Sequence, residues 1–315
     1  MAKVIRLEKH LPDTWQDAMQ DFLYWKQAQG VSERTVQDYK LHISQFFKRH
    51  PKAYDDPKTL KKNLLEYMAQ PVKPATFNLR LVYLKAFFNW CIQEGIFTEN
   101  PLSGFKRRKD EGRICNLDDD TLQQLLTLPN KKTFAGLRDY ALILLTLDTG
   151  IRPKEAFSLL VSDINLRNLN VVIRAENAKT RVSRTLPIMP ATAQAIRDLI
   201  AARHPAWKDN VPVFCTADGT TLNAQTWGDR LEYYSKKLGT KIRPYDLRHS
   251  FALLYLRNGG HAFGLQRTMG HTTLTMTRRY VNLTEADLKE QHSMASPLNT
   301  LIGTKKRVRR VKNHD

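Results

Sequence analysis

The feature that most constrains the fold is an apolar stripe at helical spacing around residue 84. The stripe consists of Phe77, Leu81, Leu84, Phe88 and Cys91, and it ends at Gly95. Intervals of three and four residues place apolar side chains on one face of a helix, and glycine is favoured just past a helix end. The stripe therefore predicts a helix whose apolar face, including Cys91, lies in a core.

Three more helices are expected before this one. They cover residues 13–30, a segment that begins at the N-capping Ser32 and stops before Pro51, and residues of about 57–70. Together the four helices predict a compact all-helical domain over residues 13–104, preceded by an N-terminal extension over residues 1–12.

The chain changes character after this domain. Residues 105–117 are densely charged and have no apolar period, which is typical of a linker. Helical periodicity then returns over residues 118–128, 137–147 and 191–202. Residues 163–187 instead alternate turn residues with β-branched or apolar ones, which predicts a small hairpin sheet. We therefore expect a second, mostly helical domain with a small sheet over residues 118–297, and a basic tail over residues 298–315.

The composition indicates a polyanionic partner. The 315 residues include 50 Lys and Arg against 31 Asp and Glu, a formal net charge of +19. Such a charge attracts nucleic acid through salt-dependent contacts, although charge alone does not separate DNA from RNA or an anionic membrane. No stretch approaches the ~18 consecutive apolar residues of a membrane helix, and the N-terminus has no signal-peptide core. Cys91, Cys115 and Cys215 have no metal-ligand spacing, so reduced thiols in a cytoplasmic protein are expected.

Four short segments carry the residue types that phosphoryl transfer to a tyrosine needs. They are Thr-Gly-Ile-Arg-Pro-Lys-Glu at 149–155, Ala-Lys-Thr-Arg at 178–181, Tyr-Asp-Leu-Arg-His-Ser-Phe-Ala at 245–252, and the segment 269–280 from Met-Gly-His to a tyrosine. Attack on a phosphodiester places more negative charge on its non-bridging oxygens. The guanidinium groups of Arg152 and Arg248 can clamp that charge in a fixed fork.

The remaining roles follow from proton chemistry. His271 can donate a further hydrogen bond to the phosphate, and the phenol of Tyr280 can form a reversible covalent link to phosphorus. The departing 5′-oxygen needs a proton, for which Lys179 is the candidate general acid. Arg181 and Arg184 lie close to Lys179 in the sequence and compete for its place near the phosphate.

These segments and their spacing resemble the tyrosine recombinase (phage integrase) family. His271 follows Arg248 by 23 residues and Tyr280 follows His271 by nine, and both intervals are similar to those of the family. One position departs from the pattern, because Tyr245 stands where the family usually has histidine, its candidate general base. A phenol is a poor base at neutral pH. We expect Tyr245 to keep a phosphate-binding role.

Two residues are expected to support the catalytic set. Glu155 is either a buried carboxylate that positions Arg152 or an ordinary charge at a helix start. His249 is interpreted as a structural residue that caps or packs the start of a helix that Arg248 opens.

The resemblance implies an N-terminal core-binding (SAM-like) domain and an α+β catalytic domain. It also implies a homotetrameric synapse on double-stranded DNA with inverted half-sites, accessory DNA-bending or directionality proteins, no membrane, and a cytoplasmic, nucleoid-associated location. The chemistry requires neither metal nor cofactor. The expected DNA-binding residues are Arg34, Lys40, Arg80, Lys85, Lys106, Arg107, Arg108, Lys109, Arg181, Arg184, Arg278 and Arg279.

Recombination is the expected activity, for integration and excision or for resolution of DNA. Two alternatives stay open: a non-catalytic DNA-binding protein on the same fold, motivated by Tyr245, and a type IB topoisomerase that cuts and reseals one strand.

Overall fold

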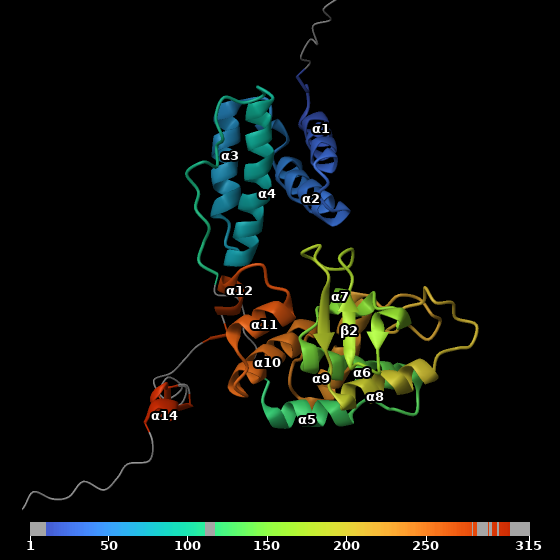
Figure 1. Cartoon of the computed structure of the whole chain (residues 1–315). Coiled ribbons are helices and arrows are strands. Elements are labelled where there is room, and N and C mark those ends of the chain that lie inside the picture. Colours follow the sequence, from blue (N-terminus) through green and yellow to red (C-terminus); the bar gives the residue numbers. More distant parts are fainter. Residues whose placement is uncertain are drawn as a thin grey trace, which may run out of the picture. The chain divides into compact units, whose positions relative to one another are not determined.

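A computed structural model describes residues 11–110, 117–278, 280–281, 289, 292–294 and 296–302. The chain divides into two compact units, Met1–Gly112 and Arg113–Asp315 (Figure 1). Most of the predicted extension over residues 1–12 and of the basic tail lies outside the described residues, as do residues 111–116 of the linker, Cys115 among them, and Arg279.

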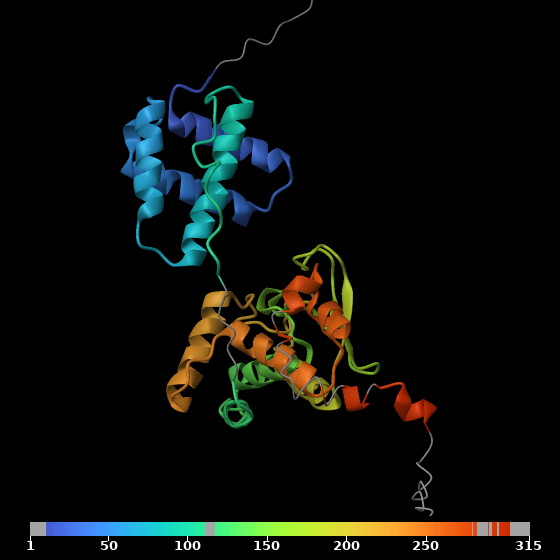
Figure 2. The same ribbon diagram turned by 90° about the vertical axis from the view of Figure 1, so that its left-hand side faces the viewer.

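The described residues of unit 1 form four α-helices, drawn in blue to teal in Figure 2. They are α1 (Trp15–Ala28), α2 (Glu33–Arg49), α3 (Pro57–Ala69) and α4 (Pro74–Gln93), with a short 3₁₀ turn, η1 (Pro51–Ala53). The side chains of Thr14, Ser32 and Asp56 accept backbone N–H groups in the first turns of α1, α2 and α3. These caps satisfy donors that a helix start leaves without a partner.

The core of unit 1 is rich in aromatic rings. All five residues of the α4 stripe are buried, as predicted, and Cys91 is fully enclosed. Phe22 of α1 meets Phe87 of α4 edge to face, with ring centroids 5.5 Å apart. Edge-to-face pairs add specific geometry to apolar burial, so the rings fix how the helices cross.

Arg80 corrects a prediction of surface exposure. Only 9% of Arg80 is exposed, and its Nη1 donates to the Tyr67 carbonyl and to Gln70 Oε1, both at 3.1 Å. The guanidinium also lies 4.3 Å from the centre of the Tyr67 ring. Arg80 thus holds α3 against α4 through its Nη1, and its side chain is buried in unit 1.

Unit 2 begins with helices and then inserts a sheet. The first helices are α5 (Asp119–Thr127), α6 (Phe134–Thr149) and α7 (Pro153–Phe157), followed by the 3₁₀ turn η2 (Val161–Asp163). The described residues contain one antiparallel sheet in the order β1 (Ile164–Asn165), β2 (Asn170–Ile173) and β3 (Arg184–Pro187). Val171 pairs with Leu186, and both side chains are buried.

The regular elements described after the sheet are helices. Its elements are α8 (Pro190–Ala201), α9 (Ala224–Leu238), α10 (Pro244–Arg257), α11 (Ala262–Met269), α12 (Leu274–Arg278) and α14 (Leu298–Leu301) (Figure 1). Helix α6 lies at the centre, because α8 and α10 both pack on it. The predicted fold class, mostly helical with a small sheet, is confirmed.

Two expectations for unit 2 differ from the structure. Helix α9 was not predicted from the sequence, although it buries Trp227, Leu231 and Tyr234. Helix α10 begins at Pro244, so Arg248 lies in its second turn rather than opening it. Proline suits the first helical position because its missing N–H has no partner there anyway.

Gly150 allows a sharp turn between α6 and Arg152. Gly150 ends α6 with φ of +61°, and a Cβ there would collide with the Phe251 ring of α10. The chain can therefore turn sharply from α6 to Ile151 and Arg152 only because residue 150 has no side chain.

Candidate active site

Three arginines converge on the C-terminal end of α11. Arg184 Nε donates to the Thr268 carbonyl at 3.1 Å, Arg248 Nη2 to the Met269 carbonyl at 2.8 Å, and Arg152 Nη2 to the Gly270 carbonyl at 3.0 Å. The last carbonyls of a helix have no intrahelical partner and carry partial negative charge. Consecutive backbone oxygens therefore hold in one place three guanidinium groups that come from distant parts of the sequence.

Glu155 is the carboxylate at the centre of this group. Its Oε1 accepts from Arg152 Nη1 at 3.1 Å, and its Oε2 lies 2.6 Å from Arg184 Nη2. Oε2 also accepts the backbone N–H of Arg152 at 3.1 Å, which caps the start of α7. Of the two alternatives for Glu155, the structure fits the buried carboxylate that positions Arg152, and the same side chain also caps the start of α7.

The charge state of Glu155 follows from its surroundings. Burial alone would raise the pKa of its carboxyl. The hydrogen bond and charge of Arg184, together with the charge of Arg152, outweigh burial and hold the pKa below its ordinary value. Glu155 is therefore ionised at neutral pH.

The sequence predicts that Arg184 binds DNA and competes with Lys179 for a place near the phosphate. In the structure only 10% of its side chain is exposed, and the side chain is held by Glu155 and by the Thr268 carbonyl. The sequence gives no sign of this, because Arg184 lies 29 residues from Glu155 and in a different element.

Arg248 is the most deeply placed of the predicted catalytic side chains. It is 4% exposed, and its Nη1 donates to the Gly150 carbonyl. Burial, and then the charge of Arg152, lower the pKa of its guanidinium to about 10. Three guanidiniums against one carboxylate leave an excess of two positive charges, which suits the binding of a phosphate anion.

His271 is held by two hydrogen bonds. Its Nε2 lies 3.2 Å from Arg248 Nη2 and its Nδ1 lies 2.9 Å from Thr277 Oγ1. Since arginine has only donors, Nε2 must accept, and the neutral ring therefore carries its proton on Nδ1. Burial, and then the charge of Arg248, lower the pKa of His271 to about 4, so the ring is neutral at pH 7.

Tyr280 lies beside two histidine rings. Its ring is nearly parallel to that of His271, with centroids 6.5 Å apart, and its hydroxyl is 2.6 Å from Nδ1 of His249. His249 was interpreted as a structural residue of a helix start. This is wrong in position, because His249 lies in the second turn of α10, and its ring contacts the predicted nucleophile.

Lys179 lies on the loop between β2 and β3, as expected, and is exposed. The same loop borders a cavity of about 770 Å³ that also exposes His271. The cavity is lined by Val172, Thr180, Val182, Ser183, Arg184, Thr185, Pro187, Gly264, Gln266, Arg267, Thr268, Gly270, His271 and Thr272. Thr180, the residue next to Lys179, thus lines this cavity together with His271, whereas Lys179, Arg152 and Arg248 are not among its lining residues.

Tyr245 stands apart from the catalytic group. It is 54% exposed, in the first turn of α10. Among the described residues, no hydrogen bond or ring contact joins Tyr245 to Arg152, Arg248 or His271.

The remaining predicted DNA-binding residues are mostly on the surface. Arg34 pairs with Asp38 at 3.2 Å, and Lys85 is half-buried, with its Nζ 3.2 Å from the Ser103 carbonyl. Arg108 is fixed to α4 through reciprocal bonds between its backbone and the Asn78 side chain, at 2.8 and 2.9 Å. The exposed members are Arg34, Lys40, Lys106, Arg107, Arg108, Lys109, Arg181 and Arg278.

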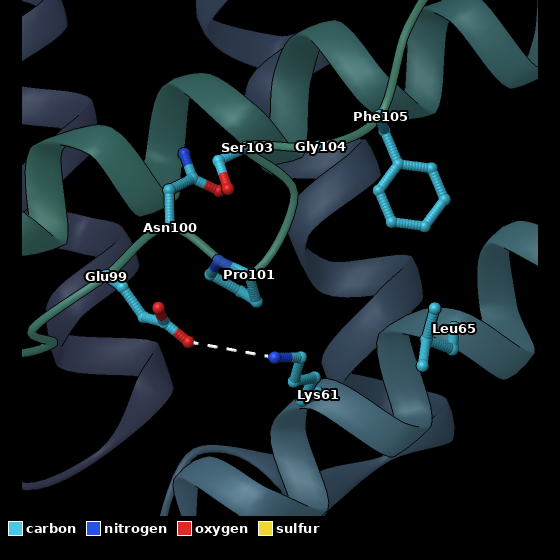
Figure 3. Close-up of a pocket in the computed structure, with 8 residues that line it drawn as sticks. All are labelled: Lys61, Leu65, Glu99, Asn100, Pro101, Ser103, Gly104 and Phe105. Atoms are coloured by element: carbon cyan, nitrogen blue, oxygen red, sulfur yellow. Dashed lines mark ion pairs between the residues drawn. The ribbon is translucent and has the colours of Figure 1, made fainter.

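A smaller cavity of about 360 Å³ in unit 1 lacks the side chains of phosphoryl transfer. Figure 3 shows Lys61 of α3 facing Glu99, with Pro101 and Phe105 on the same rim. The Lys61–Glu99 pair is 3.9 Å apart and both partners are well exposed, so it contributes little stability.

No three His, Cys, Asp or Glu residues in the described part of the chain lie close enough together to hold a metal ion. Among the described helices, none has the length and apolar character to span a bilayer.

Comparison with known proteins identifies related chains. The sequence is 26% identical to the tyrosine recombinase XerD of Listeria innocua, over 89% of this chain and 99% of the relative. It is also 26% identical to the tyrosine recombinase XerA of Pyrococcus horikoshii, over 91% and 96% of the two chains.

Solved structures share the fold. The Tn1549 transposon integrase in complex with transposon right end DNA has a TM-score of 0.70 and 20% identity, and the comparison covers 88% of this chain and 98% of that one. The XerH site-specific recombinase bound to its difH substrate has a TM-score of 0.66 and 20% identity, with 89% and 84% covered. The sequence profile of the phage integrase family matches residues 116–287, more than half of the chain. This chain therefore belongs to the phage integrase family, the family of the tyrosine recombinases.

Proposed function

We propose that this protein is a site-specific DNA recombinase that cuts and rejoins strands through a phosphotyrosine link to Tyr280. The observation that carries this proposal is the meeting of Arg152, Arg248 and His271 beside the Tyr280 phenol. A phosphodiester placed against the two guanidiniums has its non-bridging oxygens neutralised and its phosphorus open to attack by a phenol.

The reaction has two steps. The oxygen of Tyr280 attacks phosphorus and the bond from phosphorus to the 5′-oxygen breaks, leaving a 3′-phosphotyrosine and a free 5′-hydroxyl. Lys179 supplies the proton that the departing 5′-oxygen takes up. In the second step the 5′-hydroxyl of a partner strand attacks phosphorus and releases Tyr280. The phosphate bond energy is kept throughout, so no nucleotide is consumed.

The two arginines supply the main stabilisation of the transition state. A donor aimed at developing negative charge contributes about 2.7–4 kcal/mol in other enzymes. Arg152 and Arg248 are each fixed by a carbonyl of the α11 end, so neither has to be ordered when the phosphate binds. Pre-ordered donors of this kind lower the barrier without a reorganisation cost.

The domains follow the same assignment. Residues 13–104 form a core DNA-binding domain, residues 105–117 a basic linker, residues 118–297 the catalytic domain and residues 298–315 a basic tail. Four copies assemble on two DNA partners, each with inverted half-sites, with accessory proteins that bend the DNA or set direction. The DNA substrate puts this activity at the nucleoid, in the cytoplasm.

Covalent trapping tests the proposal. Wild type and the Tyr280→Phe variant are mixed with a plasmid that carries the DNA flanking the gene, and the reaction is stopped with SDS. A DNA-linked protein band is expected from wild type and is absent from Tyr280→Phe. End-mapping of the band gives the site.

The control separates the two other activities. Relaxation of a supercoiled plasmid that lacks the mapped site would indicate a topoisomerase. Salt-sensitive DNA binding without an adduct in any sequence context would indicate a binding protein and overturn the proposal.

A further inference from the structure

The proton of Tyr280 needs an acceptor, and the structure places a ring nitrogen next to it. Nδ1 of His249 is 2.6 Å from the Tyr280 hydroxyl, and the two ring centroids are 5.6 Å apart. A distance of this size is within the range over which a general base takes a proton. His249 also lies on α10, a helix that packs on α6, so it is carried on a fixed element rather than on a loop.

Other groups near Tyr280 are less suited to this role. His271 is engaged at both nitrogens, with Arg248 and with Thr277. Arg248 has no lone pair to offer, because a charged guanidinium has only donors. Tyr245 is more than half exposed in the first turn of α10, and a phenol is a poor base at neutral pH.

We propose that His249 is the general base that takes the proton from Tyr280 during strand cleavage. The inference rests on the proposed function, since it assumes that Tyr280 is the nucleophile. The O–H bond of Tyr280 breaks as its oxygen bonds to phosphorus, and the proton moves to Nδ1 of His249. On rejoining, the phosphorus–Tyr280 bond breaks and the same proton returns to the phenolate oxygen. The role requires the neutral ring tautomer of His249 with its proton on Nε2.

The position of His249 explains how the chain can have tyrosine, a poor base, at position 245. Residues 245 and 249 are four apart in α10 and so lie one above the other on the same helix face. Tyr245 occupies the position one turn nearer the helix start and is exposed, whereas His249 contacts the phenol. The chain therefore has a base on this face although residue 245 is not one.

The test uses single-turnover cleavage by the full chain. The probe is a nicked duplex that carries the site end-mapped from the wild-type adduct, and the readout is the rate of adduct formation. His249→Ala is expected to slow cleavage by about 10²–10⁴-fold, the usual contribution of a general base. His204→Ala, at an exposed histidine of the same unit, is the matched control and is expected to keep the wild-type rate.

Two further readouts separate a base from a residue that only orients the tyrosine. His249→Asn can still hydrogen-bond the phenol but cannot take its proton, so it is expected to be as slow as His249→Ala. Replacing Tyr280 with the more acidic 3-fluorotyrosine is expected to speed His249→Ala by about tenfold or more while changing wild type little, because a more acidic phenol needs less help from a base.

A sulfur leaving group locates the defect within the step. A 5′-phosphorothiolate at the scissile bond leaves without a proton, so it is expected to rescue Lys179→Ala and not His249→Ala.

The outcomes are distinct. If wild type forms an adduct that depends on Tyr280, while His249→Ala or His249→Asn cleaves within twofold of wild type, His249 is not the base and the proposed function stands. If His249→Ala is slow but equally so with tyrosine and fluorotyrosine, the residue only orients the phenol and the proposal fails. The absence of any Tyr280-dependent adduct from wild type would overturn the proposed function itself.

Discussion

Arg184 Nη2 lies 2.6 Å from Oε2 of Glu155, and this pair links the sheet to α7, the helix whose N-cap is Arg152. Both side chains are nearly excluded from solvent, Arg184 at 10% exposure and Glu155 at 2%. Removing one partner of a buried pair leaves the other charged and unsatisfied, which costs far more than the pair contributes at a surface.

Glu155→Gln is therefore expected to be strongly destabilising. The amide keeps the shape but removes the only carboxylate that faces Arg152 and Arg184 among the described residues, so about 3–5 kcal/mol of unfolding free energy should be lost. Urea unfolding followed by circular dichroism measures this. The matched control is Glu176→Gln, because Glu176 pairs with Arg174 at 3.9 Å and is 72% exposed. Equal small losses in both variants would contradict a central role for Glu155.

Gly270→Ala is expected to impair cleavage beyond its effect on stability. Gly270 has φ of +62°, and an added Cβ would lie 3.1 Å from Arg184 Cζ. The positive φ costs an alanine about 1–2 kcal/mol, and displacement of Arg184 adds a second effect at the phosphate site. Gly239→Ala is the control, since its φ is +67° and nothing lies within 4 Å of its Cβ. The melting temperature should fall in both variants, whereas the rate of adduct formation should fall only in Gly270→Ala.

The folded chain is expected to become less stable as the pH falls, in part because the buried ring of His271 resists protonation. The pKa of its ring is about 4 in the folded chain, against an ordinary value of 6.5, so the unfolded chain binds the extra proton between those values. The contribution of His271 to the free energy of unfolding is fully present above pH 6.5, and it is lost as the pH falls toward 4. Glu155, whose pKa is also lowered, adds a loss at still lower pH, below its ordinary value of 4.5.

Thermal unfolding from pH 7 to pH 4 measures the loss. In His271→Gln the melting temperature should fall less steeply between pH 6.5 and 4 than in wild type. His204→Gln should follow the wild-type curve, because His204 is exposed. An unchanged slope in His271→Gln would show that His271 does not resist protonation in the folded chain.

The buried and exposed basic residues of unit 1 should differ in their effect on DNA binding. Lys106→Gln or Arg107→Gln removes an exposed charge and is expected to reduce the slope of log affinity against log salt by about 1. Arg80→Met should lower the melting temperature and leave that slope unchanged, because the guanidinium is bound to Tyr67 and Gln70. Gel shifts at several salt concentrations measure the slope of log affinity against log salt for each variant. A reduced slope in Arg80→Met would restore Arg80 as a phosphate contact.

Helices with apolar stripes could be predicted from the sequence because each stripe is a local pattern. Helix α4 is the clearest case, since all five stripe residues are buried. Local patterns also gave the small sheet and the place of Lys179 on its loop. Helix α9 was not predicted, although its N-cap Asn223 and its C-terminal Gly239 are ordinary signals of a helix start and end.

The candidate site was predictable in residue type but not in contacts. Spacing brought Arg152, Arg248, His271 and Tyr280 to notice, whereas the bond from His249 to Tyr280 joins residues 31 apart and depends on how α10 and the segment after α12 fold together. The burial of Arg80 and the partners of Arg184 could not be predicted, because an arginine in a sequence gives no sign of its burial. Only the packed structure shows that Tyr67 and Glu155 accept their hydrogen bonds.

The three adjacent carbonyls at residues 268–270 make the positions of Arg152, Arg184 and Arg248 depend on one another. A rotation or slide of α11 by a fraction of an ångström would move the anchors of Arg152, Arg184 and Arg248 in the same direction at the same moment. A contact on the outer surface of α11, where Phe263 is 62% exposed, would therefore displace the anchors of all three guanidinium groups together. Damage to this single turn of backbone would therefore weaken all three guanidinium positions together rather than one residue at a time.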